Sequence, residues 1–455
     1  MDSSSEPMAR PSPALLSRRN RAPLGSAQPD ERHPGARRHV LLVSATSQLG
    51  GAELSLVDLA ETLDTTRWRV HVVAPPSGPL VERLRAAGVE VMTCPWLVRP
   101  QRRYAPRALW EVGNALVRAR RFIRSITVAR GIDLVHANTT AAALYVAAPP
   151  GGFVRSRTPT IWHVRDLRHG PEALWVGRSV DGILCVSTAC QKSLPRLSRA
   201  ARVEIVPSGV ALGASASPST ASAAPGLTGR AARPTLVAVG HFAPWKGHDR
   251  LLQAFASVRR RGVDAVLDVL GGDPMGYHPH AREQLERQAR DLGVTAFVSF
   301  HGVVPDPRPF LRRATCLVHA AYPEPFGRVV VEALSCGCPV LALAGSHGPA
   351  EILRDGIGGC LVSSPDPEAL ADAIVKVAGD PRLASRLALG AEEKARRLYD
   401  RRVTTGQIER YYDAVLERAG KGGAPRAGAT AARRATAPSA ATQLGSRETE
   451  QAPVP

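Results

Sequence analysis

The chain has 455 residues, and its 59 lysines and arginines outnumber its 40 aspartates and glutamates, which gives a formal net charge of +19. Apolar residues make up 44% of the sequence, which excludes a collagen-like or wholly disordered chain and allows two or three domains with cores of their own. The excess positive charge favours an anionic partner, without choosing between nucleic acid, anionic lipid and a phosphorylated ligand.

Cysteine content and the lengths of the apolar runs indicate where the protein works. Seven cysteines in a chain of this length do not make a disulfide framework, and Cys336 and Cys338 have no second pair at zinc-ligand spacing. No run reaches the roughly 18 apolar residues of a spanning helix. We therefore expect a reduced, cytoplasmic protein without a structural metal, and a peripheral position at the inner face of the cytoplasmic membrane stays open.

Three stretches have the composition of tails or linkers. Residues 1–37 and 419–455 are rich in Ser, Pro, Ala and Arg, and residues 211–232 are rich in Ser, Ala and Gly. We interpret them as an N-terminal tail, a C-terminal tail and a flexible linker that separates two halves of the chain.

Both halves follow the same rhythm, in which short apolar runs alternate with helix-compatible segments. The runs of the first half are His39–Ala45, Arg69–Ala74, Val89–Thr93, Ile132–Ala137, Thr160–Val164, Gly182–Ser187 and Val203–Val206. Those of the second half are Thr235–Gly240, Ala265–Gly271, Phe297–His301, Cys316–Ala320, Pro339–Ala344 and Cys360–Ser363.

Short, nearly all-apolar strands between helices predict a parallel sheet that is covered on both faces. We therefore predict an α/β protein with two doubly wound, Rossmann-like domains, residues 38–210 and 233–395, which face each other across a cleft. A helix in residues 396–418 is expected to pack back on the first domain.

Two motifs of the first half stand at the carboxyl ends of predicted strands, where ligands of open parallel sheets bind. Gly50-Gly51-Ala52-Glu53 lets a backbone turn approach an anion closely. It lacks the full G-x-G-x-x-G spacing, so a plain tight turn is the alternative. His163, in the stretch Trp-His-Val-Arg-Asp, would face the cleft unless it is a hydrogen-bonded structural histidine.

Two motifs of the second half carry charge. Lys246 follows a predicted strand and is either a point charge for a phosphate or an ordinary surface lysine. The stretch from Glu324 to Glu332 reads E-P-F-G-R-V-V-V-E, and it places Glu324 in a strand-to-helix loop and Glu332 within the helix. Gly327 would leave the first N–H groups of that helix open to a phosphate, and a capped helix with two solvated glutamates is the alternative.

The segment 110–130 predicts a basic amphipathic helix. Its arginines alternate with large apolar residues at helical spacing, a pattern that suits either contact with an anionic membrane or an ordinary arginine-rich surface. The arginines are Arg118, Arg120, Arg121, Arg124 and Arg130.

In this order, the motifs resemble those of glycosyltransferase family 4, whose members have the GT-B fold and retain the configuration of the transferred sugar. The resemblance covers residues 39–418 apart from the linker, and the E-x7-E pattern of Glu324 and Glu332 is its most specific mark. Val206-Pro-Ser208-Gly-Val210 also falls in the family's order, with Ser208 where the family usually has Asn.

The resemblance implies a metal-independent transfer from a nucleotide sugar, with no further cofactor, to a hydroxyl of a glycan or lipid-linked acceptor in cell-envelope or exopolysaccharide biosynthesis. It assigns Glu324, Lys246 and His163 to the reacting sugar and diphosphate, and Glu332 to the ribose hydroxyls. Gly50 and Gly51 would approach the phosphates or the acceptor from the first domain. The other donor-binding candidates are Gly240, His241, Gly272, Phe326, Gly327, Arg328 and Val329.

The family usually has an arginine at the position of His241. A neutral imidazole does not replace a guanidinium fork, so a protonated His241 or another arginine, with Arg328 as one candidate, would have to supply the charge. The alternatives are a non-catalytic or weakly active nucleotide-sugar-binding protein of this fold, an epimerase of this fold, and a charge-driven binder of nucleic acid or lipid. We expect no specific nucleic-acid partner, because aromatic residues make up only 5% of the chain and do not cluster with basic ones.

Overall fold

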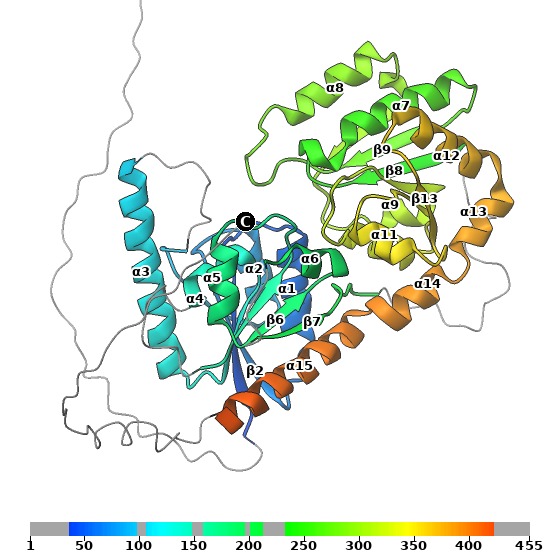
Figure 1. The fold of residues 1–455 in the computed structure, drawn as a ribbon. Coiled ribbons are helices and arrows are strands. Elements are labelled where there is room, and N and C mark those ends of the chain that lie inside the picture. The colour runs from blue at the N-terminus through cyan, green and yellow to red at the C-terminus, as the bar shows by residue number, and fades with distance from the viewer. Residues whose placement is uncertain (1–35, 98–105, 148–157, 196–200, 213–232, 423–455) are drawn as a thin grey trace, which may run out of the picture.

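A computed structural model describes residues 36–97, 106–147, 158–195, 201–212 and 233–422 of the chain. It contains two α/β domains, each built on a parallel sheet with helices on both faces (Figure 1). The predicted α/β fold with two doubly wound domains is therefore confirmed. Most of the predicted tails and linker lies outside the described residues.

The N-terminal domain has a sheet of seven parallel strands in the order β3-β2-β1-β4-β5-β6-β7. The strands are β1 (Arg38–Val43), β2 (Trp68–Ala74), β3 (Glu90–Thr93), β4 (Leu134–Ala137), β5 (Thr160–Val164), β6 (Gly182–Cys185) and β7 (Arg202–Ile205). The helices are α1 (Gly51–Thr62), α2 (Pro79–Ala86), α3 (Pro106–Ala129), α4 (Thr140–Val146), α5 (Glu172–Ser179) and α6 (Thr188–Ser193).

The C-terminal domain has a sheet of six parallel strands in the order β10-β9-β8-β11-β12-β13. The strands are β8 (Thr235–Val239), β9 (Val266–Leu270), β10 (Val298–Gly302), β11 (Cys316–His319), β12 (Val340–Leu343) and β13 (Gly359–Val362). The helices that pack with this domain are α7 (His248–Arg260), α8 (Ala281–Asp291), α9 (Arg308–Arg313), α10 (Arg328–Leu334), α11 (Gly348–Leu353), α12 (Pro367–Gly379), α13 (Pro381–Ala388) and α14 (Ala391–Lys394).

The strand orders explain where a ligand site can form. In each sheet the order reverses once, between β1 and β4 in the first domain and between β8 and β11 in the second. Loops that leave the two strands at such a reversal diverge to opposite faces of the sheet and open a crevice beyond the strand ends. The loops after β1, β8 and β11 carry Gly50, Lys246 and Glu324, so three of the predicted motifs stand at these points.

The last helix, α15 (Arg401–Gly422), leaves the C-terminal domain and packs on the N-terminal one (Figure 1). Tyr411 and Tyr412 are buried in the same apolar cluster as the residues of β1 and α1. Asp413 forms ion pairs of 2.7 Å with both Arg38 and Arg67. The chain thus crosses between the domains twice.

Further contacts join the two domains beside the cleft. The Ser187 hydroxyl donates to the Pro325 carbonyl oxygen at 2.7 Å. Glu351 of α11 accepts from the backbone N–H groups of Thr188 and Ala189, each at 2.9 Å. A carboxylate of one domain therefore caps helix α6 of the other, where the positive end of the helix dipole stabilises it.

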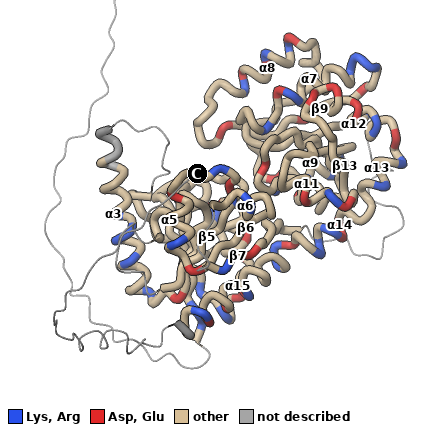
Figure 2. Tube along the Cα trace, viewed as in Figure 1, with Lys and Arg blue, Asp and Glu red and all other residues tan. Residues whose placement is uncertain are grey.

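Charged residues spread over the outer helices of both domains (Figure 2). Helix α3 keeps Arg118, Arg121 and Arg124 exposed, whereas Arg120 turns inward, donates to the Leu144 carbonyl oxygen at 2.7 Å and packs over the Trp175 ring. The expected basic face of this helix is therefore smaller than its sequence indicates. Among the described helices, none combines the length and the apolar character that crossing a membrane requires.

Candidate active site

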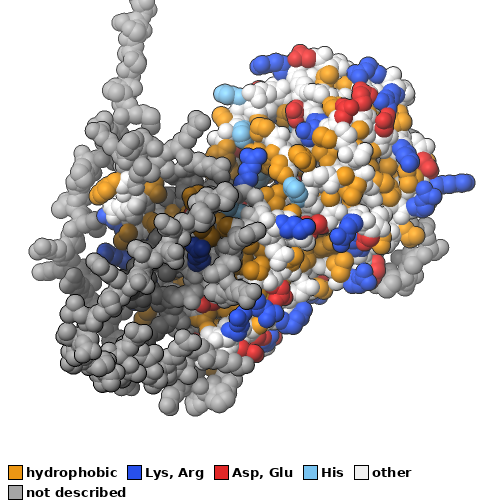
Figure 3. All heavy atoms as spheres, viewed as in Figure 1, with side chains coloured by type: hydrophobic (Ala, Val, Ile, Leu, Met, Phe, Trp, Pro, Cys, Tyr) orange, Lys and Arg blue, Asp and Glu red, His pale blue; other side chains and the backbone are white. Residues whose placement is uncertain are grey.

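A cavity of about 610 Å³ lies between the domains at the carboxyl ends of both sheets. Histidine and basic side chains lie on the side of the C-terminal domain that borders it (Figure 3). Twelve of the residues singled out from the sequence line this cavity. They are Gly50, Gly51, Gly240, His241, Lys246, Gly272, Glu324, Phe326, Gly327, Arg328, Val329 and Glu332.

Lys246 and Glu324 form an ion pair on the C-terminal wall. Lys246 Nζ lies 2.5 Å from Glu324 Oε2, and His319 Nε2 at the end of β11 lies 3.8 Å from the same oxygen. Burial would raise the pKa of the Glu324 carboxyl, but the charge of Lys246, the His319 ring and the Gly327 N–H outweigh burial and hold that pKa below its ordinary value. Glu324 is therefore an anion at neutral pH.

Gly327 is the last residue of the loop between β11 and α10, and its backbone conformation allows the chain to enter the helix. Its φ of 84° is in the left-handed region, and a Cβ there would lie 2.8 Å from Pro349 Cγ. A residue with a side chain would therefore be strained and crowded at this position. The glycine brings the backbone N–H groups at the start of α10 to the surface of the cavity.

Glu332 and Arg328 lie on one face of α10, four residues apart. Arg328 Nε donates to Glu332 Oε1 at 2.9 Å, and the other end of the guanidinium pairs with Asp58 of α1 at 2.7 Å. Burial raises the pKa of the Glu332 carboxyl, and the charge of Arg328 offsets only part of this effect. Arg328 thus joins α10 to the N-terminal domain, and its expected contact with a phosphate stays a prediction.

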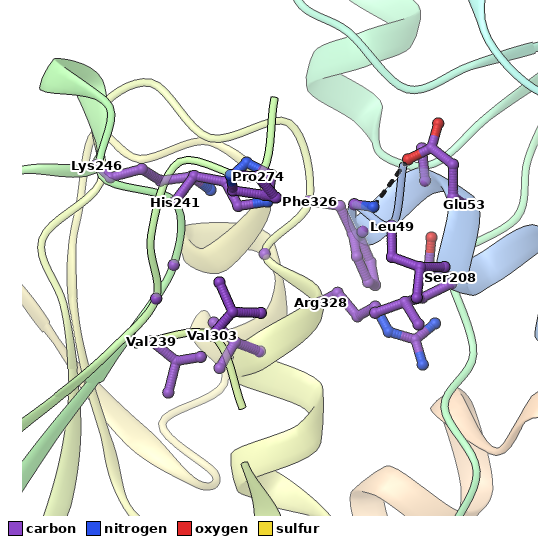
Figure 4. A pocket seen from close by; sticks show the side chains of 18 of the residues that line it. Leu49, Glu53, Ser208, Val239, His241, Lys246, Pro274, Val303, Phe326 and Arg328 are labelled. Carbon is purple, nitrogen blue, oxygen red and sulfur yellow. Dashed lines mark hydrogen bonds between the residues drawn. The ribbon is translucent and has the colours of Figure 1, made fainter. Parts of the chain in front are cut away.

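The turn before α1 forms the opposite wall. The N–H of Gly50 donates to Glu53 Oε2 at 3.2 Å (Figure 4). A Cβ at Gly50 would lie 3.7 Å from His241 of the C-terminal domain, whereas one at Gly51 would meet no atom within 4 Å. The turn therefore closes on the other domain at Gly50 and leaves open space at Gly51.

His163 does not lie where the sequence suggested. It is 2% exposed and is not among the described residues that line the cavity. Its Nδ1 lies 3.2 Å from both His136 Nε2 and an Arg165 terminal nitrogen. The structure therefore favours the alternative of a hydrogen-bonded structural histidine for His163, and the side chain of Arg165, two residues later, lines the cavity instead.

Sequence reasoning missed Arg165, Ser208 and His319 as site residues. Arg165 and Ser208 line the cavity from the N-terminal domain, and their side chains are joined by a hydrogen bond of 3.0 Å. Arg165 belongs to the stretch 162–166 at the end of β5. This stretch indicated a site residue at the strand end, but the role was given to His163. Within the described ranges, no three His, Cys, Asp or Glu side chains gather into a set that could hold a metal ion.

Comparison with known proteins matches both halves of the chain. The model described as Glycosyltransferase Family 4 matches residues 49–213, and the one described as Glycosyl transferases group 1 matches residues 228–394. The chain is 34% identical over 230 residues to a D-inositol 3-phosphate glycosyltransferase of Acidothermus cellulolyticus. This match covers 48% of this chain and 49% of the relative.

A second relative acts on a lipid. It is a GDP-mannose-dependent alpha-(1-6)-phosphatidylinositol monomannoside mannosyltransferase of Mycolicibacterium smegmatis, 33% identical over 172 residues, with 36% of this chain and 43% of the relative covered. The chain thus spans less than half the length of these curated relatives. Among solved structures, Anabaena HepE in complex with UDP and glucose superposes with a TM-score of 0.66 at 22% identity, over 82% of this chain and 99% of that one.

Proposed function

Because this chain belongs to the GT-B glycosyltransferases of family 4, we propose that it transfers a sugar from a nucleotide sugar to an acceptor hydroxyl with retention of configuration and without a metal ion. The observation that carries the proposal is the convergence of Lys246, Glu324 and Glu332 in one interdomain cavity at the strand-order reversals.

The charges of the cavity suit the bond that must break. Cleavage of a glycosyl–phosphate bond develops positive charge on the sugar and negative charge on the departing diphosphate. Lys246 and the N–H groups at the start of α10 would stabilise the diphosphate, while the anionic Glu324 faces the sugar. The departing phosphate would then accept the proton of the attacking hydroxyl.

Glu332 is the proposed ribose ligand. A carboxylate can accept hydrogen bonds from two adjacent hydroxyl groups, and Glu332 is half-buried at the cavity wall, where Arg328 already donates to one of its oxygens. Arg328 fixes the direction of the carboxylate, so the second oxygen is available for the nucleotide. The Anabaena protein binds UDP, and the Mycolicibacterium relative uses GDP-mannose, so both bases belong in the test.

A thermal-shift and hydrolysis screen tests this function. UDP-sugars and GDP-sugars are added to the wild type, to Glu332→Ala and to Glu283→Ala, which removes an exposed carboxylate on α8. Each protein is measured in parallel with EDTA and with a divalent cation present. We expect one nucleotide class to stabilise the wild type and the control, with roughly 10- to 100-fold weaker binding to Glu332→Ala, and slow release of free sugar.

The other results of the screen are equally informative. Binding without turnover, even with crude lipid or glycan acceptors, would favour a non-catalytic nucleotide-sugar-binding protein, and His241→Arg would then be the variant to examine. If no nucleotide sugar stabilises the wild type, the donor site is wrongly placed. A requirement for a divalent cation that EDTA removes would contradict metal independence.

We also propose that the acceptor is presented at a membrane surface that α3 contacts. This helix exposes Trp110 and Val128, at 74% and 76%, beside Arg118, Arg121 and Arg124, and such a mixture of apolar and basic side chains suits the boundary of an anionic bilayer. The wild type should sediment with anionic vesicles at low salt, and the triple variant with glutamine at these arginines should not. Equal recovery of both proteins in the supernatant would remove α3 from the proposal.

A further inference from the structure

Arg165 is a buried cation on the N-terminal wall of the cavity. It stands one residue beyond β5, is 8% exposed and lines the cavity. The mechanism proposed above does not use it. Its surroundings differ from those of the other basic residues at the site.

Every hydrogen-bond partner of this guanidinium among the described residues is uncharged. Nε donates to the Asn138 carbonyl oxygen at 3.1 Å and to its Oδ1 at 3.2 Å. One terminal nitrogen donates to Ser208 Oγ at 3.0 Å, and the other lies 3.2 Å from His163 Nδ1. An arginine carries five N–H donors, so each terminal nitrogen keeps one N–H for a further acceptor.

Three buried, uncharged side chains, His163, His136 and Tyr412, form a hydrogen-bonded chain that supports the guanidinium of Arg165. Arginine always donates, so His163 Nδ1 must accept and the His163 proton lies on Nε2. His136 Nε2 lies 3.2 Å from the same His163 Nδ1, and His136 Nδ1 lies 2.6 Å from the Tyr412 hydroxyl oxygen. Burial and the charge of Arg165 lower the pKa of both imidazoles, that of His136 to about 3. These three side chains therefore place no negative charge beside Arg165.

The other buried or half-buried cations of the cavity have carboxylate partners. Lys246 pairs with Glu324, Arg328 with Asp58 and Glu332, and Arg308 with Asp306. Arg165 has no ion pair with any described residue. Burial lowers its pKa to about 10, although the charge of Glu53 acts in the opposite direction. A buried charge that no carboxylate contacts directly is costly, and an anion that enters the cavity would reduce this cost.

We infer that Arg165 binds a phosphate group of the substrates from the N-terminal wall of the cavity. Asn138, which anchors Nε, also donates to the Ala52 carbonyl oxygen at 3.0 Å, so the guanidinium is tied to the start of α1 beside the open space at Gly51. Its planar fork matches two phosphate oxygens. The inference rests on the proposed function, in which the phosphate belongs either to the diphosphate of the donor or to a phosphorylated acceptor.

Calorimetric titration separates these two sources. UDP and GDP are titrated into the wild type, Arg165→Gln, Arg165→Lys and Arg83→Gln, which removes an exposed arginine from the cavity rim. Glycerol 3-phosphate is then titrated into each protein with the better nucleotide present. If the donor is the source, Arg165→Gln binds the nucleotide about 10- to 100-fold more weakly, Arg165→Lys lies between it and the wild type, and Arg83→Gln stays within about threefold.

If the acceptor is the source, nucleotide binding is unchanged and Arg165→Gln loses only the affinity for glycerol 3-phosphate. Nucleotide and glycerol 3-phosphate affinities equal to those of the wild type in Arg165→Gln and Arg165→Lys would overturn the inference and leave the proposed function intact. A wild type that binds no nucleotide would contradict the proposed function itself, and glycerol 3-phosphate alone would then decide the role of Arg165. Thermal unfolding of each variant tests whether it is folded. If Arg165→Gln is unfolded, the comparison is made with Arg165→Lys.

Discussion

Acid should destabilise this protein through its buried histidines, and His248 gives the clearest test. It is the first residue of α7, is 7% exposed and packs edge-on against the Phe242 ring, with centroids 5.2 Å apart. Burial, followed by the charge of Lys246, lowers the pKa of the His248 imidazole to about 4. In the unfolded chain a histidine has a pKa near 6.5.

The sign and size of the effect follow from these two values. As the pH falls below about 6.5, the unfolded chain takes up a proton at this position and the folded chain does not, so the free energy of unfolding decreases. Between pH 7 and pH 5 this single histidine should lower it by about 2 kcal/mol. Burial also lowers the pKa of His136 to about 3 and that of His319 to about 4, so the combined loss approaches the whole stability of an ordinary domain.

Urea unfolding followed by tryptophan fluorescence at pH 7 and pH 5 measures this dependence. We expect His248→Gln to lose about 2 kcal/mol less than the wild type between the two values, whatever its stability at pH 7. His280→Gln, at an exposed position, should lose as much as the wild type. An equal pH dependence for all three proteins would refute the argument from burial.

Three further variants or probes test the packing. Gly271→Ala should destabilise the protein by more than about 3 kcal/mol in urea, because its Cβ would lie 1.8 Å from the Gly240 carbonyl oxygen at a φ of +150°; a smaller loss would show that this contact relaxes. Glu351→Gln should weaken the cap on α6 by about 1 kcal/mol and increase the radius of gyration measured by small-angle scattering. An unchanged radius would show that other contacts hold the domains together. Cys185 and Cys190, whose thiol pKa values burial raises to about 12, should react with Ellman's reagent at pH 8 only after denaturation.

The sheets could be predicted from the sequence because strands buried on both faces are almost wholly apolar. The limits of the strands were harder to place. The apolar run Gly182–Ser187 extends past β6, which ends at Cys185, because Ser187 caps α6 and its hydroxyl accepts from the Cys190 N–H. A capping serine and a strand-end serine look alike when only the apolar pattern is considered.

The site could be predicted only in part. Glycines and charged residues after strands fall at the strand-order reversals, which is why so many of them share one cavity. The choice between His163 and Arg165 depends on which side chain clears the end of β5, and the pattern does not contain that information. The pairing of Arg328 with Asp58 joins residues 270 positions apart, so it depends on how the two domains meet.

The position of α15 also has a consequence for biosynthesis. The Tyr411 hydroxyl donates to the Ile183 carbonyl oxygen, 228 residues earlier in the chain, and the Tyr412 hydroxyl lies 276 residues from its partner His136. At a translation rate of about 5–20 residues per second, the domain that leaves the ribosome first waits tens of seconds for the helix that completes its core. Nascent chains that stop before this helix should therefore expose an apolar surface that attracts chaperones.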